Sequence, residues 1–141
     1  MKTFKFYIIV ITFLFISCSK GDNSSGSTPK PIPTPIETAV AFSVTQDPGT
    51  GNILGVVGTS QAVNIKISSA LPAAGINIEV VVKKDADNTS IFANSSSSVA
   101  ADNIVNITGL TPGVLCTAIV VVTSKSTATN SKTISFKLAA K

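Results

Sequence analysis

The chain contains side chains that nucleophilic chemistry uses, but not in the combinations that such chemistry needs. It has 141 residues, two cysteines, Cys18 and Cys116, and no histidine. Because Ser–His and Cys–His pairs need an imidazole to carry the proton, neither pair can form. Serines and lysines are frequent, yet no motif places a Ser–Lys pair. We expect the following acids to be solvated turn residues and not catalytic pairs: Glu79, Asp85, Asp87 and Asp102. The composition therefore predicts that the protein is not an enzyme.

The run Asp85-Ala86-Asp87-Asn88 begins like an oxygen-rich calcium loop. Such a loop has Gly at its sixth position and Glu at its twelfth, where this chain has Ser90 and Ser96. Asp and Asn also favour turns between strands. We expect a strand connection here, without a bound metal.

The run from Gly49 to Gly55 superficially suggests a phosphate-binding loop. It lacks the G-x-G-x-x-G spacing and the Lys-Ser/Thr ending, and no helical pattern follows it. We expect a flexible loop between strands, and no cofactor.

The N-terminus has the three zones of a secretory signal. Lys2 and Lys5 make a positive start, Phe6–Ile16 is uncharged and mostly apolar, and Ser17 and Cys18 are small. Eleven helical residues span about 16 Å, whereas the hydrocarbon core of a membrane is ~30 Å thick. The segment is therefore too short for a stable transmembrane helix.

The run Leu14-Phe15-Ile16-Ser17-Cys18 resembles the lipobox of bacterial lipoproteins, although Phe15 departs from the usual Leu. The resemblance implies that residues 1–17 are removed and that Cys18 carries acyl chains such as palmitate. Ser19, where inner-membrane lipoproteins have Asp, implies the outer membrane, facing either the periplasm or the surface. The alternative is a plain signal peptide in which Cys18 is an incidental thiol.

The segment after Cys18 is composed like a tether and the remainder like a folded domain. Residues 18–36 are rich in Ser and Gly and then alternate proline from Pro29 to Pro35, a composition that stays extended or flexible. Residues 37–141 form the expected domain, with seven Lys and six acids. Only Lys83 and Lys84 cluster. Nucleic-acid binding needs a basic stripe and usually stacking aromatics, so it is not expected.

Apolar residues alternate with polar ones along most of residues 37–141, which predicts β-strands. Turn-forming clusters separate the alternating runs. This pattern predicts an all-β fold, a single antiparallel β-sandwich of six or seven short strands. The runs lie at 42–45, 63–68, 76–83, 105–108 and 134–138.

The segment from Ile107 to Gly113, followed by a strand from Val114 to Thr123, resembles the E–F corner of fibronectin type III domains. Leu110, Pro112 and Gly113 match that family's pattern, but its corner Tyr is replaced by Cys116. The resemblance implies a fibronectin type III-like or immunoglobulin-like sandwich and carries no catalytic residues.

Alternation along residues 114–123 places Cys116 inward. The inward-facing set is then Cys116, Ala118, Val120 and Val122. The outward apolar set is Leu115, Ile119 and Val121, which marks either a covered face or a contact surface.

Together these features predict a non-catalytic, membrane-anchored lipoprotein. Its partners would be the membrane, through the lipid on Cys18, and another envelope protein or a surface polymer. The alternative is a carbohydrate-capture lipoprotein of a polysaccharide-uptake system. Sugar binding commonly uses exposed aromatic platforms, whereas the alternation mostly buries Phe42, Phe92 and Phe136.

Overall fold

Eight β-strands lie in the part of the chain that the structure describes. The computed structural model describes residues 36–141, so the predicted signal peptide, Cys18 and nearly all of the linker lie outside the described residues. No helix occurs among the described residues. The strands are β1 (Phe42–Val44), β2 (Ile53–Val56), β3 (Gln61–Ile67), β4 (Ile76–Lys84), β5 (Ser90–Ser98), β6 (Asp102–Ile107), β7 (Leu115–Ser124) and β8 (Ser131–Ala140).

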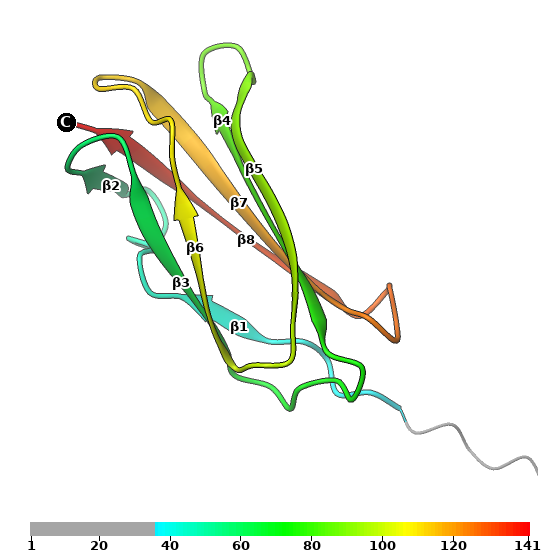
Figure 1. Cartoon of the computed structure of the whole chain (residues 1–141). Helices are drawn as coiled ribbons and strands as arrows, with labels where there is room; N and C mark the ends of the chain where they lie inside the picture. Colours follow the sequence, from blue (N-terminus) through cyan, green and yellow to red (C-terminus); the bar gives the residue numbers. More distant parts are fainter. Residues whose placement is uncertain (1–35) are drawn as a thin grey trace, which may run out of the picture. The chain divides into compact units, whose positions relative to one another are not determined.

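The strands form two sheets that pack face to face as a β-sandwich (Figure 1). The smaller sheet has the order β1-β3-β6, and the larger has the order β2-β8-β7-β4-β5. The chain changes sheet at every connection from β1 to β4, and again between β5 and β6 and between β6 and β7. These crossings place strands that are adjacent in sequence in opposite layers. The predicted all-β sandwich is thus confirmed at the level of two packed sheets.

One pairing departs from the predicted antiparallel arrangement. β2 pairs with β8 in parallel, with Leu54 opposite Leu138 and Val56 opposite Ala140. β1 and β2 lie in different sheets, so the segment between them is not a hairpin. A hairpin would have reversed the direction of the chain and paired the two strands antiparallel. The expectation of a wholly antiparallel sandwich was therefore wrong at this edge.

The core lies between the sheets and follows the alternation predicted from the sequence. Along β4 and β7 the inward apolar side chains are at most 1% exposed, whereas the side chains between them are half-buried or exposed. Burying each Val or Ile contributes roughly 1.5–3 kcal/mol relative to leaving it exposed. The inward apolar residues of these two central strands are Ile76, Ile78, Val80, Val82, Cys116, Ala118, Val120 and Val122.

Two strands were not predicted. β2 overlaps the end of the segment from Gly49 to Gly55, which was expected to be a flexible loop. β5, with the sequence SIFANSSSS, lacks alternation because most of its side chains are exposed on both faces. β5 extends the larger sheet by pairing with the buried strand β4, so pairing and not burial defines it as a strand.

The β3–β4 turn depends on a glycine. Gly75 has φ +84°, and a Cβ built there would lie 2.5 Å from the carbonyl oxygen of Ser98. Only glycine tolerates both the left-handed conformation and this close approach. The turn therefore brings the start of β4 directly against the end of β5.

Candidate functional site

The residue predicted to be modified, Cys18, lies outside the described residues. The sites that can be described are the polar clusters, the thiol and the sheet surfaces of residues 36–141. Within this range there is no helix of the length and apolarity that a membrane crossing requires.

A polar cluster joins β4, β7 and β8 on the outward face of the larger sheet. Asp85 follows β4, and its carboxylate forms an ion pair with Lys137 of β8. The Thr117 hydroxyl donates to Asp85 Oδ1 at 2.6 Å, and Lys137 Nζ also donates to Thr117 Oγ1 at 2.8 Å. Lys137 and Thr117 are cross-strand partners, which explains how residues far apart in sequence meet. Each of the three groups thus contacts the other two.

This cluster has the composition of a hydroxyl–amine pair but not its reactivity. The hydrogen bond from Lys137, and to a smaller extent the one from Thr117, lowers the pKa of Asp85 below its usual 3.8. The carboxylate therefore stays charged near neutral pH. Lys137 Nζ donates both to Asp85 and to Thr117 Oγ1, so the hydroxyl faces a donor on its lysine side and not a proton acceptor. The arrangement therefore clasps three strands together and does not activate Thr117. No sequence motif could have identified it, because Asp85, Thr117 and Lys137 meet only through strand register.

The predicted strand connection after Asp85 is a tight turn in which each acid has a local partner. Asp87 Oδ1 accepts a hydrogen bond from the Thr89 N–H at 2.9 Å, which lowers the pKa of Asp87. Asn88 adopts the left-handed conformation, with φ 58°. Because Asp85 is turned toward Lys137 and Asp87 toward Thr89, the two carboxylates do not converge on a shared position.

Cys116 lies in the core, as the alternation predicted. Its side chain is 1% exposed, and burial raises the pKa of the thiol, with a further contribution from the charge of Asp85. Within residues 36–141 it is the one cysteine, and it forms no disulfide. A thiol that is buried and protonated packs as a small apolar group and is a poor nucleophile.

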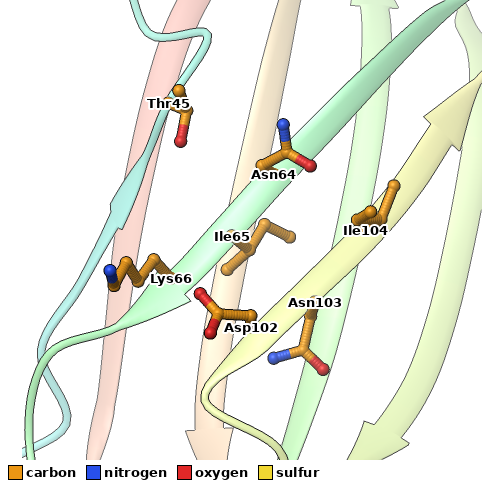
Figure 2. Close-up of a pocket in the computed structure, with 7 residues that line it drawn as sticks. All are labelled: Thr45, Asn64, Ile65, Lys66, Asp102, Asn103 and Ile104. Carbon is orange, nitrogen blue, oxygen red and sulfur yellow. The ribbon is translucent and has the colours of Figure 1, made fainter.

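A hollow of about 210 Å³ lies on the smaller sheet, across the end of β1, the middle of β3 and the start of β6 (Figure 2). Lys66 and Asp102 are cross-strand neighbours there, and amide groups lie on either side of them. The hollow offers hydrogen-bonding groups, and its lysine and carboxylate form no ion pair with each other; we assign it no reaction. Its lining residues are Thr45, Asn64, Ile65, Lys66, Asp102, Asn103 and Ile104.

The apolar side chains predicted to face outward from β7 do so. Ile119 and Val121 are half-buried, and Leu115 is 37% exposed. Val81 of β4 lies opposite Ile119, so the half-buried residues form a short apolar stripe across the central strands of the larger sheet. The smaller sheet packs on the opposite face, so the partial burial of this stripe comes from its neighbours within the same sheet.

A latch that the sequence did not reveal holds the start of the domain. The Asn130 side chain accepts a hydrogen bond from the Val40 N–H at 2.7 Å and donates to Thr38 O at 2.9 Å and to Glu37 Oε2 at 3.1 Å. The backbone carbonyl of Asn130 also accepts a hydrogen bond from the Ser124 N–H at 2.9 Å, and this bond closes the β7–β8 turn. In the sequence, Asn130 is one of several Asn residues in turn-forming segments, so nothing singled it out as the residue that makes these contacts.

The segment compared with a phosphate loop is an ordinary turn that leads into β2. Asp47 Oδ1 accepts a hydrogen bond from the Gly49 N–H at 2.9 Å, and Gly49 and Gly51 both have positive φ. A strand and not a helix follows, so no helix N-terminus is aimed at this turn.

Sequence comparisons with known proteins found no relative of this chain. No family model matches the chain, and no curated protein matches its sequence.

Proposed function

We propose that this protein is a non-catalytic lipoprotein of the bacterial outer membrane. In this proposal acyl chains on Cys18 hold it in the membrane, residues 18–36 are the tether, and residues 37–141 are a binding or structural module. The module contacts another envelope protein or a surface polymer. The observation that carries the proposal is the short apolar run that ends in Ser17-Cys18 and is followed directly by a Ser/Gly/Pro-rich segment.

The latch around Asn130 supports the division between tether and module. Glu37 and Thr38, the first residues after the proline-rich segment, are already hydrogen-bonded to Asn130 in the β7–β8 turn. The tether therefore joins the domain at the pole that contains this turn. Eighteen residues at about 3.1 Å each would let the module stand up to roughly 50 Å from the lipid.

We further propose that the module is a fibronectin type III-like or immunoglobulin-like sandwich. In the lettering of that architecture, the order β1-β3-β6 corresponds to strands A-B-E, and β8-β7-β4-β5 corresponds to G-F-C-C′. The corner before β7 fits the same scheme, because Leu110 is buried and Gly113 has φ 75°. In this scheme Cys116, which is buried, stands at the sequence position of the corner Tyr. This architecture serves many unrelated functions, so it supports a module but names no ligand.

Carbohydrate capture is the weaker alternative. The aromatic residues of the described range are Phe42 and Phe136, which are buried, and Phe92, which is half-buried against the core. Sugar binding commonly uses a fully exposed aromatic face, and none of these three side chains is fully exposed. The apolar stripe at Val81, Ile119 and Val121 is better suited to a protein contact.

Lipid labelling tests the anchor directly. The full chain is expressed in a bacterial host with a labelled fatty acid, beside the Cys18→Ala variant. We expect the label in the wild-type chain alone, together with partition of the wild type into the detergent phase. A wild-type chain that takes up no label and stays in the aqueous phase would overturn the anchor.

Lipid labelling does not reveal what the module contacts, so a second experiment addresses the contact. A photo-crosslinking side chain placed at Ile119, in the apolar stripe, is compared with one at Ser43 on the opposite sheet. We expect a discrete protein adduct from Ile119 only. Adducts of equal yield from both positions would count against the stripe as a contact surface.

A further inference from the structure

Strand β5 is an exposed edge of the larger sheet. It is nine residues long, and its one partner among the described strands is β4 (Figure 1). A strand paired on one side only presents a row of backbone N–H and C=O groups on the other side. These groups are a ready template for another strand.

The other sheet edges are shorter. β1 has three residues, β2 has four, and β6 has six and begins with the charged Asp102. Natural proteins usually protect long edges with charged side chains, proline or bulges. β5 has no charged residue and no proline, and its pairing with β4 is irregular only near Lys83 and Ser90. The stretch from Phe92 to Ser98 is therefore regular, long and unprotected.

The inner side of β5 extends beyond the smaller sheet. Asn94 and Ser96 lie opposite Val80 and Ile78, which are buried, yet both are exposed. Cross-strand partners point to the same face, so Asn94 and Ser96 point inward but have no opposing sheet above them. Polar side chains in this position keep the overhang soluble without blocking the backbone edge.

We infer that β5 is a self-association edge at which a second copy of this chain pairs antiparallel about a two-fold axis at Ser95. The regular stretch is centred on this residue, so Phe92 would face Ser98 of the partner, Ala93 would face Ser97, and Asn94 would face Ser96. All these side chains are uncharged, and all but Phe92 are small, so no like charges meet across the axis. The two five-stranded sheets would become one continuous sheet.

The charge distribution also favours a second copy as the partner. The charged side chain nearest the axis is Glu79, the neighbour of Ser95 on β4. The two Glu79 side chains would be three strand spacings apart, about 14 Å. This exceeds the Debye length of about 10 Å at moderate salt, so their repulsion is screened. Seven to nine residues on each side make a smaller contact than the ~20–30 residues of a standard interface, so we expect a weak, reversible dimer.

Cysteine crosslinking of the full chain tests this inference. Ser95→Cys places a thiol directly on the proposed axis, and Ser43→Cys, an exposed position of β1 on the other sheet, is the matched control. Opposed residues in a strand pair have Cβ atoms about 4.5–5.5 Å apart, within reach of a disulfide after a small adjustment. We expect a disulfide-linked dimer with Ser95→Cys at a yield at least tenfold above that of Ser43→Cys. The unmodified chain gives the background from Cys18 and Cys116.

Register is tested by mixing two further variants. Asn94→Cys and Ser96→Cys would each crosslink poorly alone but well when mixed, because each faces the other across the axis. Ser95→Lys places like charges opposite one another and should abolish the dimer, whereas Ser95→Thr should retain it. Equal crosslinking of Ser95→Cys and Ser43→Cys would overturn the inference. So would adducts of Ser95→Cys only with a different protein, or only with another segment of the same chain. Because purified chain in solution suffices, these outcomes are independent of lipidation at Cys18.

Discussion

The side chain of Asn130 accepts a hydrogen bond from the backbone N–H of Val40 at 2.7 Å, across ninety residues of sequence. This contact ties the N-terminal entry of the domain to the turn between its last two strands. Because the same amide also donates to Thr38 and Glu37, one side chain secures the point at which the proposed tether is attached.

Replacing Asn130 with Ala should detach this entry segment. The change removes three hydrogen bonds, of which the bond from the N–H of the buried residue Val40 is the most costly to lose. We expect a loss of about 1–3 kcal/mol in the free energy of unfolding. Urea denaturation of Asn130→Ala measures it, with Asn106→Ala, at an exposed position of β6, as the control. Equal stability of the two variants would mean that the latch contributes nothing.

Asp85 should make stability depend on pH in the acid range. Its pKa is lower in the folded protein than the usual 3.8, so the folded state holds the carboxylate in its charged form. Its stabilising contribution is complete above about pH 4–5 and is lost as the pH falls through the folded-state pKa. We expect Asp85→Asn to reduce stability at pH 7 and to flatten the slope of stability between pH 5 and pH 2.

The control for this prediction is Asp102→Asn. Asp102 takes part in no ion pair among the described residues, so this variant leaves the Asp85–Lys137 pair in place. If Asp85→Asn and the wild type lose stability in parallel on acidification, the Asp85–Lys137–Thr117 clasp is not the source of the slope.

Cys116 should behave as a packing residue. Cys116→Ala removes one buried sulfur, and we expect a loss of about 1 kcal/mol. Cys116→Asp should cost far more, because an unpaired carboxylate would be placed in the core. The native thiol is 1% exposed and should react with a maleimide only after unfolding. Rapid modification of the folded protein would contradict the placement of β7.

The domain should fold without a disulfide or a metal ion. Within residues 36–141 Cys116 is the one cysteine, and Asp85 and Asp87 are each engaged locally. We expect residues 37–141 to melt in one cooperative transition whose Tm is the same with and without reductant or chelator. A marked fall in Tm with chelator would restore the calcium loop that begins at Asp85.

Alternation in the sequence was informative wherever a strand has one buried face. In β3, β4 and β7 the apolar residues at every second position are the buried ones, so strand position and side-chain direction were both predictable. β5 escaped prediction because it overhangs the other sheet, so burial does not select its side chains. β2 escaped because four residues beside glycines are too few for a period to show.

The polar contacts were less predictable than the strands. The Asp85–Lys137–Thr117 clasp depends on the register of three strands, and a shift of one residue would separate its members. The Asn130 latch depends on where the chain enters the domain beside the β7–β8 turn. The proline-rich segment before this point has no periodicity from which that position could be predicted. By contrast, the inward position of Cys116 followed from strand periodicity alone and is confirmed.

Mass spectrometry of the N-terminal peptide of the mature protein is the most direct test of the proposed anchoring. The full chain is expressed in a bacterial host, extracted from membranes and digested. The account predicts that the mature chain begins at Cys18 and that this residue carries acyl chains, while Cys18→Ala accumulates unprocessed or unacylated. A mature chain that begins elsewhere, or that carries an unmodified Cys18, would contradict it.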